Sequence, residues 1–279
     1  MTQPASHEVV LITGCGSGIG KALAIAFHRR GHRVCATARR LHTMQDLAEQ
    51  GIQTLALDVT QASDIQRVLD ELRQRGHTVG TLVNNAGYGA MGPLLDVPDS
   101  EWQKQFDVNV FAPMALTRAV LPDMVRRRRG QIVNISSVSG VMPTPFAGAY
   151  CASKAALNAA SDALRMELRP LGIAVVTVQP GGIQSAFGER AADDVNLAPD
   201  SPYQAIRAGV LSRANESQVG ATPAEHFASE LVDKLAAPHP PAVIRLGQKS
   251  TLLPLMKRAL PTAWLDRILM KRFHLDRLA

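Results

Sequence analysis

Cysteine is scarce in this sequence. Its three cysteines, Cys15, Cys35 and Cys151, are far apart along the chain. A disulfide framework needs more cysteines, and a metal site built from cysteines needs them closely spaced. We therefore expect reduced thiols that pack as small apolar groups, and we expect no metal site.

Long apolar stretches are also missing. No run approaches the roughly 18 apolar residues that a membrane-spanning helix requires. The segment from Met1 to Glu8 has neither the basic nor the apolar region of a secretory signal. These absences predict a cytoplasmic protein. Its 279 residues, of which 46% are hydrophobic, are sufficient for one well-buried α/β domain.

The net charge of +6 is concentrated at one end of the chain. Residues 249–279 contain seven lysines and arginines against two aspartates, and the rest of the chain is nearly neutral. A second basic cluster, Arg126 to Arg129, precedes Gly130 at the expected end of a helix, where cations complement the helix dipole. Because the charge is local, we predict no nucleic-acid partner.

Short apolar, β-branched runs alternate with longer segments of helical periodicity. This alternation predicts parallel strands that are joined by helical crossovers and covered on both faces. The expected fold is a single-domain α/β, Rossmann-type, doubly wound parallel sheet with helices on both faces. Strands are predicted at residues 9–13, 33–37, 53–57, 81–84, 131–136, 174–179 and 242–246, and the main helices at residues 19–30, 64–75, 113–129 and 153–171.

Two segments interrupt this alternation. Residues 185–222 are too long for an ordinary connection in a compact domain, and we predict that they form a mobile flap over a substrate site. Residues 252–279 combine apolar side chains with cations in an amphipathic helix that prolines interrupt. We therefore divide the chain into a dinucleotide-binding catalytic domain, residues 1–248, and a basic amphipathic helical extension, residues 249–279. The extension either packs against the domain or a partner subunit, or makes peripheral contact with a membrane.

A glycine-rich turn follows the first predicted strand, with the sequence TGCGSGIG at residues 13–20. Glycines at positions 14, 18 and 20 permit positive φ angles and a close approach of the backbone to a pyrophosphate. The N-terminus of the following helix favours negative charge. This succession of strand, turn and helix predicts a dinucleotide site, although a purely structural turn has the same composition.

The second predicted strand is followed by Arg39 and Arg40. The acidic residue that binds the adenosine ribose hydroxyls of NAD is missing there, and an arginine at this point can pair with a 2′-phosphate. We therefore predict that the cofactor is NADP(H) rather than NAD(H) and that Arg39 binds its phosphate. An ordinary exposed charge is the alternative.

Ser137, Tyr150 and Lys154 form the constellation that carries the predicted chemistry. A tyrosine and a lysine four residues apart lie on one face of a helix, so the ammonium is expected near the phenol. A neighbouring cation favours the phenolate, which would lower the pKa of Tyr150 from its usual value of about 10. Ser137 can donate a hydrogen bond to a substrate oxygen that gains charge. Together these groups predict general acid–base catalysis.

The order of these motifs resembles that of the short-chain dehydrogenase/reductase family over residues 8–190. The spacing of the three glycines is similar to the family's own glycine pattern, and the sequence NNAG at residues 84–87 matches its loop motif. The resemblance implies that Asn109 is a structural and catalytic residue that holds a water in the proton path. It also implies that Ser185, where the family commonly has threonine, bonds the nicotinamide carboxamide.

The resemblance thus assigns catalytic roles to Asn109, Ser137, Tyr150 and Lys154. Asp58 and Val59 are similar to the pair that contacts adenine in the family. The cofactor-binding residues that it implies are Gly14, Ser17, Gly18, Ile19, Gly20, Arg39, Asp58, Val59, Asn85, Ala86, Gly87, Tyr150, Lys154, Pro180, Gly181, Ile183 and Ser185.

We therefore predict an NADP(H)-dependent oxidoreductase that interconverts a carbonyl and an alcohol. The start and the tail of the chain resemble the branch that contains hydroxysteroid, retinol and acyl-lipid ketone reductases, which implies a bulky apolar substrate. Candidates to line its pocket are Val141, Met142, Phe146 and Phe187, and core packing is the alternative for them. A non-catalytic NADP(H)-binding sensor is the alternative, because a fold alone does not establish an activity. The resemblance further implies a homodimer or homotetramer that assembles through the helices at residues 113–129 and 153–171.

Overall fold

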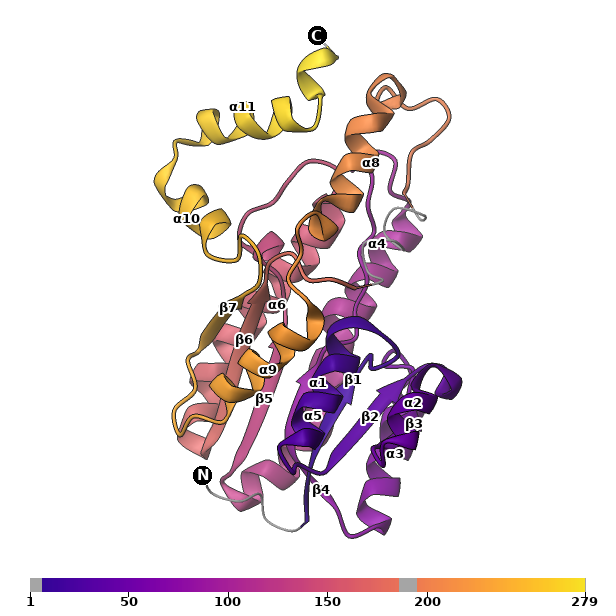
Figure 1. Cartoon of the computed structure of the whole chain (residues 1–279), viewed down its shortest axis with the longest axis vertical. Coiled ribbons are helices and arrows are strands. Elements are labelled where there is room, and N and C mark those ends of the chain that lie inside the picture. Colours follow the sequence, from indigo (N-terminus) through magenta and orange to yellow (C-terminus); the bar gives the residue numbers. More distant parts are fainter. Residues whose placement is uncertain (1–6, 186–194, 279) are drawn as a thin grey trace.

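The computed structural model describes residues 7–185 and 195–278. Its centre is a seven-stranded sheet in the order β3-β2-β1-β4-β5-β6-β7, and every pair of neighbouring strands is parallel (Figure 1). The strands are β1 (Glu8–Thr13), β2 (Val34–Ala38), β3 (Gln53–Ala56), β4 (Thr78–Asn84), β5 (Gly130–Ile135), β6 (Ile173–Pro180) and β7 (Val243–Leu246).

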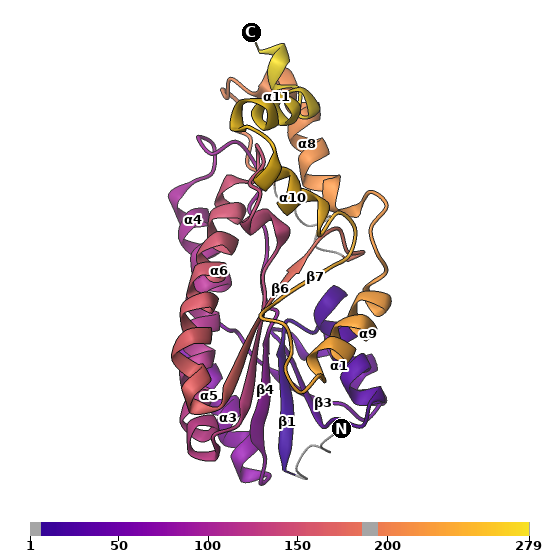
Figure 2. The ribbon, with the colours of Figure 1, turned by 90° about the vertical axis from the view of Figure 1, so that its left-hand side faces the viewer.

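Helices cover both faces of this sheet, as the edge-on view in Figure 2 shows. One face carries α1 (Gly18–Arg29), α2 (Gln45–Glu49) and α9 (Ala224–Leu235), and the other carries α3 (Ala62–Gln74), α5 (Ala112–Arg127) and α6 (Gly148–Leu168). Beyond the carboxyl ends of the strands lie α4 (Asp99–Phe106), α8 (Arg207–Asn215), α10 (Leu252–Ala259) and α11 (Thr262–Arg272). Short helical turns are η1 (Leu41–Met44), η2 (Asp107–Phe111), η3 (Val138–Gly140), η4 (Arg169–Leu171), η5 (Gln204–Ile206), η6 (Glu216–Gln218) and η7 (Leu275–Arg277).

The predicted doubly wound parallel α/β fold is confirmed, and all seven strands overlap their predicted positions. Most boundaries differ by one or two residues, and two elements begin three or more residues before their predicted starts. β4 begins three residues before the predicted strand, because Thr78 and Val79 pair with β1 across a shift in register. α6 begins at Gly148, five residues before the predicted start, so Tyr150 lies inside the helix.

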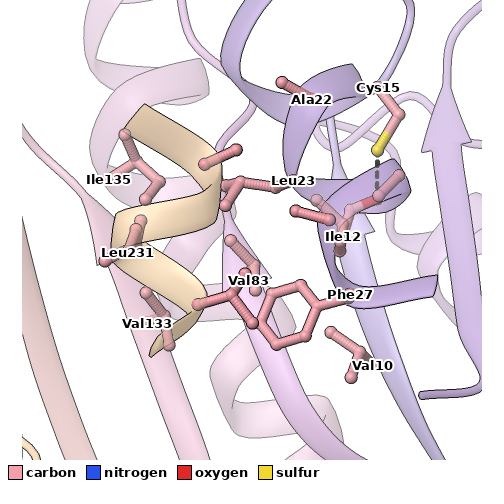
Figure 3. Packing of buried hydrophobic residues seen from close by; sticks show 14 of the residues in the cluster. Val10, Ile12, Cys15, Ala22, Leu23, Phe27, Val83, Val133, Ile135 and Leu231 are labelled. Carbon is pink, nitrogen blue, oxygen red and sulfur yellow. Dashed lines mark hydrogen bonds between the residues drawn. The ribbon is translucent and has the colours of Figure 1, made fainter. Parts of the chain in front are cut away.

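Figure 3 shows how α1 and α9 are held on the sheet. Leu23 and Phe27 of α1 and Leu231 of α9 point towards Val83 and Val133 of the central strands, and all five side chains are buried. Burying a leucine or phenylalanine side chain contributes about 2 kcal/mol. This packing fixes the N-terminus of α1 against the carboxyl end of β1.

The strand order reverses direction at β1, which pairs with β2 on one side and with β4 on the other. The crossovers that leave β1 and β4 therefore turn to opposite faces of the sheet. In open parallel sheets this switch point leaves a crevice at the carboxyl ends of the strands, where ligands bind. A ligand site is therefore expected at the loops that follow β1 and β4.

The described part of the predicted flap, residues 195–222, contains α8 and lies across the carboxyl end of the sheet (Figure 1). Ala214 of α8 packs against Tyr150 and Cys151 of α6. The segment therefore packs beside the predicted catalytic tyrosine, while its mobility and its role as a substrate flap stay predictions. Phe187, which the sequence offers as a pocket-lining residue, lies outside the described residues.

The C-terminal extension packs against the flap. Phe273, which follows α11, is fully buried among Phe146, Ile206 and Val210. The two helices α10 and α11 lie above the carboxyl ends of the strands beside α8 (Figure 2). One face of the extension therefore packs on the domain, while the division of the chain at residue 248 stays a prediction.

Within the described residues, no helix is long and apolar enough to cross a membrane. The same residues contain no group of three or more His, Cys, Asp or Glu side chains that is placed to hold a metal ion. Cys15, Cys35 and Cys151 are buried free thiols, and burial raises the pKa of each. They are therefore neutral apolar groups of the core.

Candidate active site

Two loops meet where β1 and β4 end. The Asn85 side-chain amide donates a hydrogen bond to the Thr13 carbonyl across 2.8 Å. The backbone N–H groups of Asn85 and Ala86 each donate to Thr13 Oγ1 across 3.0 Å. Short polar side chains often tie loop backbone together in this way. The NNAG loop and the glycine turn are consequently one rigid unit.

The glycine turn requires glycine at two positions in particular. Gly14 has a φ of +73°, and a Cβ on it would lie 2.8 Å from the Ala86 Cα. Gly18 has a φ of +56°, and a Cβ on it would lie 2.8 Å from the Ser185 Cβ. Other side chains rarely adopt such φ angles and would also clash here. The turn therefore packs closely on two loops that supply predicted cofactor ligands.

The start of α1 has the properties of an anion site. Ser17 precedes the helix in an extended conformation, and its side chain makes no capping hydrogen bond. The first turn, which begins with Gly18, Ile19 and Gly20, contains no acidic residue. Backbone N–H groups at the beginning of a helix attract phosphate through both hydrogen bonds and the helix dipole. A closely packed glycine cradle with uncapped N–H groups fits the pyrophosphate of a dinucleotide.

The predicted ligands of the adenosine half follow β2 and β3. Arg39 comes directly after β2, is exposed, and forms no ion pair with any carboxylate that the structure describes. Asp58 Oδ1 accepts hydrogen bonds from the Thr60 N–H at 3.0 Å and the Thr60 hydroxyl at 2.7 Å. Val59 is buried in the core beneath α3. Asp58 and Val59 thus fix the turn after β3, and Arg39 is available to an anion.

The loop after β6 is held by the segment that follows β7. β6 ends at Pro180, and the next residue, Gly181, donates its N–H to the Leu246 carbonyl across 2.9 Å. A Cβ on Gly181 would lie 1.9 Å from the Gln248 carbonyl oxygen. Glycine is therefore needed here for close approach of backbone to backbone, which is a structural reason for the Pro-Gly pair.

Gln218, which sequence reasoning missed, positions the end of the same loop. Its Oε1 accepts a hydrogen bond from the Ser185 N–H at 3.1 Å, and its Nε2 donates to the Ile183 carbonyl at 3.2 Å. The Ile183 side chain is buried in the core. Ser185 is thereby held against the glycine turn, where the resemblance places a nicotinamide contact.

The side chains of Ser137, Tyr150 and Lys154 converge at the carboxyl end of β5. Tyr150 is 8% exposed and Lys154 is 5% exposed, and the hydroxyl groups of Ser137 and Tyr150 share a hydrogen bond. Lys154 Nζ lies 5.9 Å from the centre of the Tyr150 ring and donates to the Ile135 carbonyl at 2.9 Å. The structure thus brings the three predicted groups together in a nearly dry site.

Asn109 joins the same site through η2, a π-helical turn between α4 and α5. Its Nδ2 donates to the Tyr88 carbonyl and to Ser153 Oγ, both at 3.1 Å. Ser153 Oγ in turn donates to the Tyr150 carbonyl at 2.8 Å. Single π turns are frequent at functional sites because they redirect one side chain out of a regular helix. The predicted role of Asn109 towards a water stays a prediction.

The cofactor loops and the catalytic groups are in direct contact. A Cβ on Gly87, the last residue of the NNAG loop, would lie 2.9 Å from Asn109 Oδ1 and 3.5 Å from Lys154 Nζ. The loop after β4 therefore ends against the two side chains that the resemblance makes catalytic. The predicted cofactor ligands and the predicted proton-transfer groups consequently form one site.

One expectation, the lowered pKa of Tyr150, is wrong. Burial raises the pKa of Tyr150 to about 12, whereas the sequence argument predicts a lowered value. The hydrogen bond from Ser137 and the charge of Arg213 lower it only in part. Burial also lowers the pKa of Lys154 to about 8, so the lysine loses its proton well before the phenol does. The ammonium that was expected to stabilise the phenolate is therefore absent when the phenol ionises.

Sequence reasoning missed Arg213, whereas it named Phe146 as a candidate for the substrate pocket. Phe146 adopts a φ of +62° although it is not glycine, and packing against Tyr203 holds it there. Such a conformation is unusual for a bulky residue and occurs where the surrounding structure enforces it. Arg213 of α8 is 6% exposed, and its Nε donates to Thr144 Oγ1 at 2.5 Å. Arg213 belongs to no motif, so the sequence carries no signal for it.

Comparison with known proteins is consistent with this geometry. The family model described as short chain dehydrogenase matches residues 8–196. The NADPH-dependent 1-acyldihydroxyacetone phosphate reductase of Schizosaccharomyces pombe is 36% identical over 215 residues, which are 75% of this chain and 72% of that protein.

Two solved structures are similar over most of the chain. A short-chain dehydrogenase from Streptomyces avermitilis has a TM-score of 0.79 and 29% identity, with coverage of 99% of this chain and 98% of that one. The closed form of a serine dehydrogenase in complex with NADP+ has a TM-score of 0.75 and 27% identity, with coverage of 87% and 96%.

Proposed function

Since the chain belongs to the short-chain dehydrogenase/reductase family and is an oxidoreductase, we propose that it uses NADP(H) to interconvert a ketone and an alcohol on a bulky apolar lipid substrate. The observation that carries this proposal is the buried contact of Ser137, Tyr150 and Lys154 beside the glycine turn. A protein that only senses the dinucleotide has no need of a buried phenol that is hydrogen-bonded to a serine.

The choice of NADP(H) rests on the charge at the end of β2. Arg39 is exposed there, at the position where NAD-binding folds carry an acidic residue for the ribose hydroxyls. A guanidinium can bind a phosphate through two parallel hydrogen bonds. The similar acyldihydroxyacetone phosphate reductase is NADPH-dependent, and the similar serine dehydrogenase binds NADP+.

The proton transfer follows from the burial of Tyr150. With a pKa of about 12, the phenol stays protonated across the physiological pH range and is ready to act as a general acid. During reduction its proton passes to the carbonyl oxygen of the substrate. NADPH, when bound, supplies the hydride that completes the alcohol.

The neighbouring side chains orient this transfer. Ser137 hydrogen-bonds the phenol and is placed to donate to the same substrate oxygen as charge develops on it. Lys154, whose Nζ is anchored on the Ile135 carbonyl, supplies a positive charge close to the phenol and is placed to hold the nicotinamide ribose. Asn109 holds α6 to the loop after β4, so that these groups keep their positions.

The lipid character of the substrate is inferred from the surroundings of Tyr150. Met142 and Phe146 are apolar residues of the loop that leads to α6, and Met91 belongs to the same buried apolar cluster as the tyrosine. Pockets for ligands of this kind are mainly apolar with a few polar groups that set orientation. The similar reductase from S. pombe acts on an acyl-lipid ketone. The substrate that fits best is therefore a ketone with an apolar chain.

The exposed face of the C-terminal extension fits a lipid surface. Leu265 and Phe273 are buried against the domain, whereas Trp264 is 62% exposed and Ile268 is 47% exposed on the other side of α11. Arg267 and Lys271 stand on the same helix. Apolar side chains among cations are typical of helices that lie on anionic membranes. We therefore propose that this face contacts lipid next to the site.

Sedimentation with vesicles tests the proposed contact. The wild type should sediment with vesicles that contain phosphatidylserine, and salt or the double change Trp264→Ser and Ile268→Ser should reduce binding at least fivefold. The matched control is Leu41→Ser, because Leu41 is also exposed but stands far away on η1. Equal binding by the double variant would contradict the proposal, as would concentration-dependent dimerisation through the same face.

Assembly into a homodimer or homotetramer is proposed through α5 and α6. Val125 on α5 and Met166 on α6 are exposed apolar side chains on the two helices that the family uses for this purpose. Apolar side chains on a helix face are frequent at homodimer interfaces. Analytical ultracentrifugation of the wild type and of Met166→Glu tests this, since the charge should shift the protein towards monomers.

The proposed activity is tested by following reduced-nicotinamide absorbance with NADPH or NADH and a panel of steroid, retinoid and acyl-lipid ketones. Oxidation of NADPH that depends on an acyl-lipid ketone supports the proposal. Faster turnover with steroids or retinoids would correct the substrate class. Tight binding of NADPH without turnover of any carbonyl would instead favour the non-catalytic sensor.

A further inference from the structure

The flap places a buried cation beside the catalytic tyrosine. Arg213 is in the last turn of α8, and the next residue, Ala214, packs on Tyr150 and Cys151. Only 6% of the surface of Arg213 is exposed. Its charge acts on both Tyr150 and Cys151, so the guanidinium lies within electrostatic reach of the reacting phenol.

No carboxylate that the structure describes forms an ion pair with this guanidinium. Its hydrogen bonds to described residues go to the Thr144 hydroxyl and the Cys151 thiol, and both groups are neutral. The charge of Glu216, one turn further on, acts on Arg213 from a distance, but this carboxylate is hydrogen-bonded to Arg272 at 2.6 Å and to Lys249 at 3.2 Å. Buried charges in proteins are normally paired, because an unpaired charge loses its hydration without compensation.

A purely structural role does not account for this charge. A neutral side chain could bond Thr144 without the cost of burying a cation, and burial does lower the pKa of Arg213. A buried arginine that no described carboxylate pairs with, next to a reacting group, is the arrangement expected where a ligand supplies the paired negative charge. Guanidinium is suited to that role, because its planar N–H groups match phosphate and carboxylate oxygens.

We propose that Arg213 binds an anionic group of the substrate, a phosphate or a carboxylate, and so makes the enzyme select charged lipid ketones over neutral ones. The inference rests on the proposed reductase function, since it names the class of ketone that this site accepts. Tyr150 then acts on the carbonyl, Arg213 holds the charged end of the molecule, and the apolar residues on the loop before α6 meet its chain.

Matched pairs of ketones test the selection. An acyldihydroxyacetone phosphate is compared with the same molecule without phosphate, and a long-chain keto acid with its methyl ester. For Arg213→Met we expect kcat/KM to fall about thirtyfold with the charged ketone, which is the size expected for loss of a hydrogen bond to a buried ion. The fall should lie mostly in KM, and the neutral ketone should change less than threefold.

Two further variants distinguish the loss of the Arg213 charge from a general disturbance of α8. Arg213→Lys keeps the positive charge but not the planar fork, and it should recover part of the loss. Arg207→Met removes an exposed arginine from the same helix and should leave both ketones within twofold of the wild type. An equal loss with charged and neutral ketones in Arg213→Met would overturn the proposal, as would a wild type that prefers the neutral ketone of each pair.

A binding measurement decides the question even if no ketone is reduced. With NADP+ present, octyl phosphate or octanoate should raise the Tm of the wild type by several degrees, whereas octanol should not. A higher Tm with octyl phosphate alone identifies the anionic group as a phosphate, and a higher Tm with octanoate alone identifies it as a carboxylate. The rise should disappear in Arg213→Met. A rise that persists in this variant would overturn the role of Arg213, whereas an absence of ketone turnover alone would count against the reductase function.

Discussion

Lys154 and Tyr150 stand one turn apart on α6, with the lysine Nζ 5.9 Å from the centre of the tyrosine ring. Both side chains are almost fully buried, and burial moves their pKa values in opposite directions. Burial therefore makes the charged form of each group less stable than it is in water. Such perturbed pairs are common at catalytic sites, where function sets the environment at the expense of stability.

The burial of Lys154 predicts a more stable variant. Its pKa falls from 10.5 in the unfolded chain to about 8 in the folded one, which corresponds to a cost of about 3 kcal/mol at neutral pH. Replacement by methionine removes this cost and loses one hydrogen bond worth about 1 kcal/mol. Lys154→Met should therefore unfold at higher urea concentration at pH 7, by about 2 kcal/mol, while losing activity.

The size of the stability advantage of Lys154→Met depends on pH. Between pH 8 and 10.5 the unfolded chain binds more protons at Lys154 than the folded one, so the stability of the wild type rises with pH in this window. The advantage of Lys154→Met should be complete below pH 8 and should shrink as the pH approaches 10.5. Urea unfolding of both proteins at pH 7 and at pH 10 measures this. A variant that is less stable at pH 7 would contradict the account.

The rate of ketone reduction should fall as the pH rises through about 8. Tyr150, with a pKa of about 12, stays protonated there, whereas Lys154, with a pKa of about 8, loses the charge that stabilises the site. A profile of kcat/KM against pH shows the fall in the wild type. Lys154→Arg keeps its charge at these pH values, so whatever activity remains should be independent of pH up to about 10. The same fall in both proteins would assign it to another group.

Sequence patterns predicted the parts of the structure that depend on local properties. The seven strands, the glycine turn and the NNAG loop follow from apolar runs and from residues that set backbone angles, such as Gly14. The spacing of Tyr150 and Lys154 likewise predicted their common helix face. These features need no knowledge of distant contacts, because the residues involved are neighbours in the sequence or follow strands in a fixed order.

Long-range packing determined what the sequence could not predict. The direction of the Tyr150 pKa depends on how deeply α8 and the loop before α6 bury the ring, and no local pattern specifies that depth. Arg213 reaches the site only because the flap folds back over the sheet. Leu94 from another loop fills the space where a Cβ on Gly148, the first residue of α6, would lie, and no local pattern predicts this long-range contact.

Gly14→Ala should weaken binding of NADPH at least tenfold. The new Cβ would stand 2.8 Å from the Ala86 backbone, so the turn and the NNAG loop must separate. Gly31→Ala is the matched control, because Gly31 has a similar φ of +79° but nothing within 4 Å of its Cβ. It should cost about 1 kcal/mol of stability and leave the affinity unchanged. Fluorescence titration compares the two, and equal affinities would contradict close packing at the cofactor site.

Arg39→Ala should raise the Kd for NADPH about thirtyfold and change the Kd for NADH less than twofold. Loss of charge-assisted hydrogen bonds to the 2′-phosphate accounts for an effect of this size. Arg40→Ala changes an exposed arginine at the next position and is the control. Calorimetric titration with both cofactors distinguishes the outcomes. An equal increase in the Kd for NADPH and for NADH would mean that Arg39 does not bind the 2′-phosphate.

The proposed role of Tyr150 is proton transfer during NADPH-dependent reduction of a ketone. Its most direct test is the absorbance of NADPH with an acyl-lipid ketone for the wild type, Tyr150→Phe and Tyr203→Phe. Tyr150→Phe should lower kcat about a thousandfold while NADPH still binds. Tyr203→Phe, which keeps the ring that packs on Phe146, should retain activity. A Tyr150→Phe enzyme with a rate close to that of the wild type would contradict the account.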